Sequence, residues 1–125
     1  MSFEIRPYQP SDLATLYNIC LLTGDRGEDA SHLLQDKKLI GHYYAAPYGV
    51  LEPQVCFIVS HQGVPCGYII GTSCSVEFAA RCERDWFPAL REQYPARIGA
   101  AQNLTETLIS YIHQGYHPRP EYQDY

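Results

Sequence analysis

Three carboxylates lie close together in one short segment of the chain. Asp25, Glu28 and Asp29 belong to the stretch DRGEDAS, residues 25–31. Clustered carboxylates can bind a cationic acceptor, and a carboxylate that loses contact with water gains the raised pKa of a general base. The same acids could instead cap a following helix from a solvated loop. The spacing fits both interpretations, so Asp25, Glu28 and Asp29 are candidate substrate-binding residues.

Three tyrosines form a second candidate group. Tyr43, Tyr44 and Tyr48 lie within six positions of one another, and their hydroxyls could line a substrate pocket. The chain has 11 tyrosines, however, and tyrosines of this abundance are also expected from packing in the core and at its rim. Both interpretations remain open for these three residues.

The histidines and cysteines do not form a recognisable catalytic or metal-binding pattern. The histidines at 42, 61, 113 and 117 are scattered, without a Ser or Cys nucleophile at a familiar spacing. The five cysteines include no C-x-x-C pair, and most lie among apolar or small residues: Cys20, Cys56, Cys66, Cys74 and Cys82. We expect reduced, mostly buried thiols and no metal site.

Composition excludes some classes of protein. A chain of 125 residues with 46% apolar and 18% charged residues fits one globular domain. The net charge of −5 argues against a nucleic-acid partner, which would require clustered Lys and Arg. No apolar run approaches the ~20 residues of a membrane span, and the N-terminus does not resemble a signal peptide. These features predict a cytoplasmic protein without a membrane partner.

Two short β-strands joined by a tight turn form the clearest structural pattern. Residues 55–72, VCFIVSHQGVPCGYIIGT, place β-branched and aromatic residues on both sides of a Gly/Pro turn and predict a hairpin. Phe3 and Ile5 alternate with polar neighbours ahead of Pro7, which predicts a short opening strand.

Apolar spacing and cap residues predict the helices. The first would begin at the N-cap Ser11, present an apolar face from Leu13 to Leu21, and stop at Gly24. The remaining predictions are a helix from Leu33 to Tyr44 interrupted by Gly41, a loop at Pro47-Tyr48-Gly49, helical structure from Glu77 to Tyr94 broken at Pro88, a last helix from Asn103 and Glu106 to about His113, and an extended tail from Gly115 to Tyr125.

Taken together, these segments resemble the GNAT superfamily of N-acetyltransferases. More narrowly, the chain is similar to the acetyltransferase-like domain attached to O-GlcNAcases and to its free-standing bacterial relatives. The resemblance runs from about residue 3 to residue 95. It is carried by Ile5-Arg6-Pro7, Asp12, Tyr17 to Cys20, Thr23 to Ser31, Leu39-Ile40-Gly41, Ala46-Pro47-Tyr48, Leu51-Glu52-Pro53, Cys66-Gly67-Tyr68 to Thr72, Trp86-Phe87-Pro88 and Tyr94-Pro95.

The resemblance implies an α/β fold with a mixed, mostly antiparallel sheet and flanking helices. In this family the fourth strand and the phosphate-binding loop after it hold acetyl-CoA, and the loop binds the pyrophosphate at a helix N-terminus. We expect residues 1–125 to form the N-terminal, acceptor-side half of the domain, truncated after the third strand and a helical insertion from about Ser73 to His113. The segment Arg97 to Ala101 superficially resembles the phosphate loop, but its internal spacing is wrong and no predicted strand precedes it.

The implied activity is acetyl transfer from acetyl-CoA to an amine on a small molecule or a protein. The alternative is a non-catalytic pseudo-acetyltransferase or protein-interaction module. By resemblance, acetyl-CoA is the co-substrate of the complete domain, no cofactor is expected for this chain alone, and catalytic residues remain unassigned. The third strand would present an unpaired edge, so we also expect a homodimer through that edge, or the tail folded back onto it.

Overall fold

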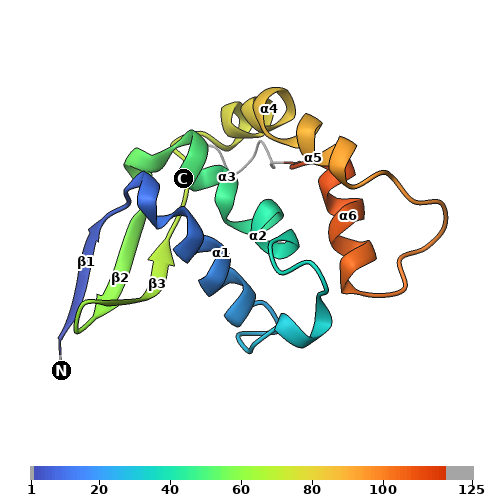
Figure 1. Cartoon of the computed structure of the whole chain (residues 1–125). Coiled ribbons are helices and arrows are strands. Elements are labelled where there is room, and N and C mark those ends of the chain that lie inside the picture. The colour runs from blue at the N-terminus through green and yellow to red at the C-terminus, as the bar shows by residue number, and fades with distance from the viewer. Residues whose placement is uncertain (1, 118–125) are drawn as a thin grey trace. The chain divides into compact units, whose positions relative to one another are not determined.

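The computed structural model describes residues 2–117, and Figure 1 shows its helices and strands. The chain divides into two compact units, Met1–Gly71 and Thr72–Tyr125. The first unit contains the sheet and helices α1 to α3, and the second contains α4 to α6. The predicted tail falls largely on residues 118–125, which lie outside the described residues.

A three-stranded antiparallel sheet forms one part of the first unit. Its order is β1 (Phe3–Pro7), β2 (Phe57–His61) and β3 (Val64–Ile69), with β2 in the centre. The predicted hairpin is confirmed, because β2 and β3 are joined by a two-residue turn in which Gln62 and Gly63 have φ values of 53° and 80°. Such positive φ angles match the right-handed twist of the two strands.

The two faces of the sheet differ in their environment. Ile58 of β2 is fully buried and pairs with Tyr68 of β3, and α1 (Leu13–Leu22) contacts β3. On the alternate face Phe3 and Ile5 are 62% and 63% exposed. The side chains of a strand point alternately to opposite faces, so the helices of the first unit cover only the face that carries Ile58.

The start of α1 differs from the prediction. Ser11 is not its N-cap, because a 3₁₀ turn at Pro10–Asp12 precedes the helix. The Asp12 carboxylate accepts a hydrogen bond from the Gln9 backbone N–H at 2.8 Å and two from the Arg6 guanidinium, also at 2.8 Å. Asp12 is only 6% exposed, so this charged pair fastens β1 to the beginning of the helix.

The predicted helix from Leu33 to Tyr44 is wrong at its beginning. The structure has a 3₁₀ turn at Ser31–Leu33, and α2 then runs from Leu39 to Tyr44. Gly41 does not interrupt this helix, because α2 crosses the ring of Tyr17 so closely that a side chain at this position would overlap it. The close approach between α1 and α2 therefore accounts for the glycine.

The predicted loop at Pro47-Tyr48-Gly49 is also wrong. These residues belong to a helix, α3 (Ala46–Leu51), with the proline in its first turn. Proline is tolerated there because the first backbone N–H groups of a helix have no partner within the helix.

The second unit follows the sequence prediction more closely. The helix breaks at Trp86 between α4 (Ser75–Asp85) and α5 (Phe87–Gln93), with Pro88 in the first turn of α5, and α6 spans Leu104–Gln114. The Asn103 side chain accepts a hydrogen bond from the Glu106 backbone N–H at 2.9 Å, which confirms the predicted cap. Tyr116 contacts the rings of Phe78 and Phe87, with centroids 6.0 and 5.1 Å away, and so ties the chain after α6 to α4 and α5.

Candidate functional site

A cleft of about 370 Å³ lies in the first unit, where the end of α1, helix α2 and strand β3 meet. Each of these elements contributes uncharged side chains to its wall. The lining residues are Cys20, Thr23, Gly24, Ile40, Tyr44 and Tyr68. None of the six carries a formal charge at neutral pH, so the cleft favours an uncharged group or the apolar part of a substrate.

Local sequence explains how these residues meet. Cys20 belongs to the inward stripe of α1 and is 4% exposed. Gly24 follows the helix, and a Cβ there would overlap the Ile40 side chain and approach the Cys20 carbonyl oxygen to 2.9 Å. Helix α1 ends at Leu22, two residues before the end predicted at Gly24. Glycine is required at position 24 by close packing and not by a left-handed backbone conformation.

Tyr68 and Cys20 form a polar pair in the wall of the cleft. The Tyr68 hydroxyl and the Cys20 thiol lie near enough to each other to influence each other's pKa. Burial raises the pKa of the Tyr68 hydroxyl, and the neighbouring thiol raises it further. Burial also raises the pKa of the Cys20 thiol, against a smaller lowering by Tyr68. Both groups therefore keep their protons at neutral pH.

The predicted acidic segment forms a tight turn directly after the cleft residues Thr23 and Gly24. Asp25 and Glu28 exchange two backbone hydrogen bonds of 2.9 Å, and the residues between them, Arg26 and Gly27, have φ values of 55° and 87°. Glu28 is exposed and Asp25 is half-buried. The turn thus carries two carboxylates next to the cleft in sequence, in a backbone conformation that is fixed locally.

Asp29 has a different environment from Asp25. Its carboxylate accepts a hydrogen bond from the Ser31 backbone N–H at 2.7 Å, ahead of the 3₁₀ turn. Hydrogen bonds from the Ser31 side chain and backbone lower the pKa of Asp29 below its ordinary value. A lowered pKa makes the carboxylate a weaker base, so the contacts of Asp29 favour the capping interpretation.

Of the three candidate tyrosines, Tyr44 lines the cleft. Tyr43 contacts Tyr44 edge to face, with ring centroids 4.9 Å apart. Tyr48 lies on α3, half-buried, and is not among the cleft residues. The sequence did not single out Cys20 or Tyr68 as site residues. The signal available for Tyr68 was its two-residue spacing from Cys66 and Ile70 in an apolar strand, which does not by itself distinguish a cleft from a core position.

A tyrosine–histidine pair lies one turn before Cys20 on α1. The Tyr17 hydroxyl and the His42 Nδ1 atom are 2.8 Å apart, and their rings meet edge to face. Burial raises the pKa of Tyr17 to about 12 and lowers the pKa of His42. His42 is therefore neutral near pH 7. Its hydrogen bond with the Tyr17 hydroxyl joins α1 to α2 beside the cleft.

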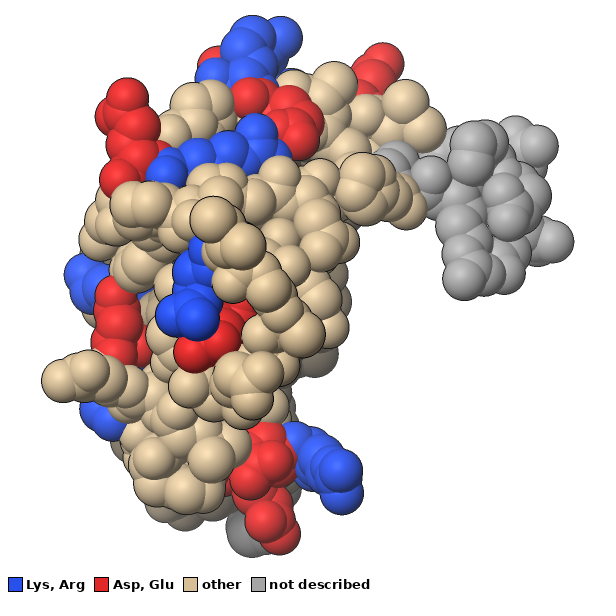
Figure 2. Space-filling view, turned by 90° about the vertical axis from the view of Figure 1, so that its right-hand side faces the viewer, with Lys and Arg blue, Asp and Glu red and all other residues tan. Residues whose placement is uncertain are grey.

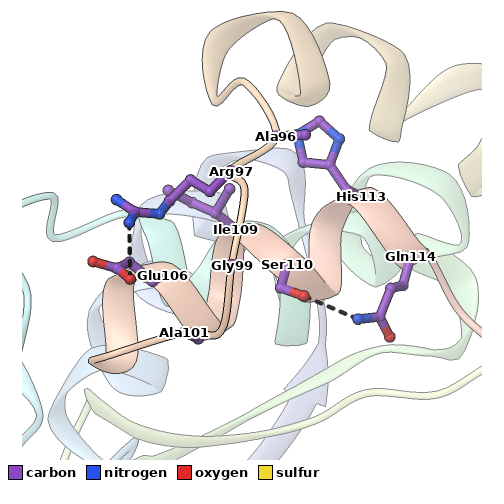
Figure 3. A pocket seen from close by; sticks show the side chains of 9 residues that line it. All are labelled: Ala96, Arg97, Gly99, Ala101, Glu106, Ile109, Ser110, His113 and Gln114. Carbon is purple, nitrogen blue, oxygen red and sulfur yellow. Dashed lines mark hydrogen bonds and ion pairs between the residues drawn. The ribbon is translucent and has the colours of Figure 1, made fainter.

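The second unit has its own cavity, of about 200 Å³, between α6 and the loop before it (Figure 3). The loop carries Arg97, which forms an ion pair with Glu106 at 3.2 Å, and on α6 the Gln114 amide donates to the Ser110 hydroxyl at 2.9 Å. The Glu106 carboxylate also accepts a hydrogen bond from the Gln102 backbone N–H at 3.0 Å. Glu106 and the Asn103 cap thus occupy the N-terminus of α6.

This arrangement bears on the segment from Arg97 to Ala101, which superficially resembles a phosphate-binding loop. A phosphate would have to compete with the Glu106 carboxylate for the same backbone donors, and the two negative charges would repel each other. The residues at this helix end therefore do not fit the pyrophosphate of acetyl-CoA.

The described residues show no grouping for a metal ion. Within residues 2–117, no three His, Cys, Asp or Glu side chains lie in an arrangement that could hold a metal. No helix in the described part of the chain is long and apolar enough to cross a membrane. Figure 2 shows acidic and basic side chains next to each other on the face that it presents.

Comparison with known proteins identifies relatives of this chain. No family model matches the sequence. Over 120 residues, 95% of the chain, it is 29% identical to Protein O-GlcNAcase of Rattus norvegicus and equally to that of Mus musculus. The chain spans only 13% of the length of these curated relatives. The crystal structure of SsHAT superposes with a TM-score of 0.82 and 30% identity, covering 91% of this chain and 57% of that one.

Proposed function

We propose that this chain is an acetyltransferase-like domain whose first unit binds the amine acceptor of an acetyl-CoA-dependent N-acetyltransferase. Its homology to O-GlcNAcases and its GNAT-like α/β fold support the proposal. The observation that carries the proposal is the cleft at the end of α1, with the turn at Asp25–Glu28 beside it in sequence. An uncharged cleft next to carboxylates suits a substrate with an apolar stem and an ammonium group.

The two parts of this site would act on different parts of the acceptor. Carboxylates at the turn attract the ammonium form of an amine, and the cleft holds the rest of the molecule in place. Acetyl transfer requires the amine to lose a proton and to lie in a fixed orientation toward the thioester. Of the three acids, Asp25 is the best candidate to orient the ammonium group, because it is half-buried and directly follows the cleft residue Gly24.

Steady-state kinetics of the full-length protein test the proposal, with acetyl-CoA and a panel of small amines and lysine peptides as acceptors. Asp25→Asn should lower kcat/KM for the preferred acceptor at least ~10-fold, which corresponds to about 1.4 kcal/mol, and leave the KM for acetyl-CoA unchanged. Asp29→Asn is the matched control and should have little effect, since Asp29 is engaged by Ser31. Unchanged kinetics in both variants would remove the turn from the site.

A second function, that of a non-catalytic interaction module, is favoured by one observation. None of the six residues that line the cleft is ionised at neutral pH, so the cleft wall itself supplies no general base. Release of CoA in the presence of the amine panel distinguishes the two functions. Acetyl transfer to any amine above the rate of acetyl-CoA hydrolysis supports the enzyme, and its absence with every amine supports the module.

A further inference from the structure

One face of the β-sheet is apolar and exposed. The strand register brings three rows of directly opposed residues to this face: Phe3, His61 and Val64; Ile5, Val59 and Gly67; and Pro7, Phe57 and Ile69. Glu4 and Arg6 alternate with these residues along β1 and therefore point to the opposite face. The nine residues of the three rows, here called the open face, include no Asp, Glu, Lys or Arg.

The exposure of these side chains is unusual for a sheet. An antiparallel sheet with one face toward water normally alternates between inward apolar and outward polar residues. On the open face the largest exposed fractions are 62% for Phe3, 63% for Ile5, 64% for Val64 and 48% for Ile69. The only polar side chain in the rows is His61, whose Nε2 atom is buried without a hydrogen-bond partner and whose ring lies 4.8 Å from that of Phe3. The open face thus offers mainly apolar surface to a partner.

The size of the open face indicates what kind of contact it can make. A side chain of this size has about 150–200 Å² of accessible surface, so the four exposed residues present roughly 400 Å² of apolar area on each copy. The partly exposed residues between them raise this figure to about 500–600 Å², or about 1,000–1,200 Å² when two such faces meet. An interface of about 1,000 Å² reaches the lower limit for a specific contact, and an apolar patch of several hundred Å² is typical of an association site.

We propose that the open face is the interface of a homodimer, in which two copies of this chain pack their sheets face to face. Two sheets pack in this way about 10 Å apart, with their strands within about 30° of each other. A two-fold axis through the central row brings Ile5 and Val59 against the same residues of the second copy. No charge on either face opposes this contact, and none is present to select an unlike protein, since charged groups supply much of the specificity between different partners.

This dimer differs from one formed through the edge of β3. Pairing of two edges adds hydrogen bonds to the backbone of β3, whereas face-to-face packing leaves that backbone unchanged and buries side chains instead. Substitution of a side chain on the open face therefore weakens the proposed dimer and spares an edge dimer. The proposal also does not depend on acetyl transfer, because it concerns only the association of the chain with itself.

Sedimentation equilibrium of the chain from about 1 to 500 µM tests the proposal, because a small interface gives a dimer that dissociates on dilution. Ile5→Lys should raise the dissociation constant at least ~10-fold, since each dimer would bury two ammonium groups without partners. Val50→Lys is the matched control and should leave the constant unchanged, because Val50 is 46% exposed but belongs to α3. Circular dichroism checks that both variants fold. A chain that stays monomeric over the whole range, or a dimer that Ile5→Lys leaves intact, would overturn the proposal.

A second measurement uses the unaltered chain and so does not depend on a variant folding. In a mixture of ¹³C-labelled and unlabelled copies, the methyl groups of Ile5 and Val59 should give intermolecular NOEs at concentrations where the dimer forms. Hydrogen exchange of the amides at the outer edge of β3 should stay independent of concentration, because the dimer does not use that edge. Absence of these NOEs in a populated dimer, or protection of the edge amides on dimerisation, would assign the contact to another surface and refute the proposal.

Discussion

Replacement of Gly41 by alanine has two opposing effects on stability. Alanine has the higher helix propensity, but its methyl group would clash with a neighbouring side chain. Gly41 lies inside α2, where alanine is favoured over glycine by about 1 kcal/mol in an exposed helix. A Cβ at Gly41 would lie 3.0 Å from Cε1 of Tyr17 and closer still to Cδ1 of the same ring. Real Cβ atoms essentially never approach so closely, so either the ring or the helix must move.

The expected loss of stability follows from the contacts that a shift of the ring or the helix would disturb. Overpacking of this kind costs roughly 1–3 kcal/mol. The Tyr17 ring also holds the 2.8 Å hydrogen bond to His42, whose loss costs about 0.5–1.5 kcal/mol. After subtraction of the helix preference, Gly41→Ala should lower the free energy of unfolding of the first unit by about 0.5–3.5 kcal/mol.

Urea unfolding followed by circular dichroism measures this change. Gly71→Ala is the control, because a Cβ at Gly71 meets nothing within 4 Å and its backbone has no positive φ. In the double variant with Tyr17→Ala, the cost of the new methyl group should largely disappear, giving a coupling of at least about 1 kcal/mol. Gly41→Ala that is as stable as the unaltered chain, or more so, would show that the helix preference outweighs the contact.

Three further predictions concern pH and helix capping. Arg6 lowers the pKa of Asp12 below 3.8 in the folded chain. The Arg6–Asp12 pair therefore stabilises the fold above pH 3.8, and this contribution is lost as the pH falls through the pKa of Asp12 in the folded chain. Asp12→Asn should flatten the loss of stability on acid titration. Burial lowers the pKa of His42 below 6.5, so His42 takes up a proton more readily in the unfolded chain than in the folded one. The free energy of unfolding should therefore decrease as the pH falls below about 6.5, and His42→Gln should remove this pH dependence. Asn103→Ala should cost about 1 kcal/mol in thermal or urea unfolding by removing the acceptor for the Glu106 N–H, and an unchanged stability would show that the cap is dispensable.

The homodimer expectation can be examined on the same protein. Within the described residues, β3 lies at the edge of the sheet and pairs only with β2. Light scattering at ~100 µM and hydrogen exchange of residues 66–72 would test whether this edge is covered. Until then the homodimer stays a prediction.

The sequence by itself determined the elements that depend on neighbouring residues. The hairpin turn follows from Gln62 and Gly63, the separation of α4 from α5 follows from Pro88, and the start of α6 follows from Asn103. In each case the determining interaction spans at most a few positions, so a residue type at one place fixes the backbone there. The fold class was predicted from the resemblance to the GNAT superfamily, which the order of these elements supports.

Only the tertiary structure decided where α2 begins, why glycine occurs at positions 24 and 41, and which residues line the cleft. Gly24 is explained by Ile40, and Gly41 by Tyr17, in each case a residue at least 16 positions away. The cleft joins Cys20 to Tyr68 across 48 positions. No rule of spacing connects such distant residues, because their contact depends on how α1 packs against α2 and β3. In the sequence, Gly24 and Gly41 indicated only the end or interruption of a helix, and Tyr68 indicated only a strand. Their roles in close packing and in the cleft wall depend on the tertiary structure.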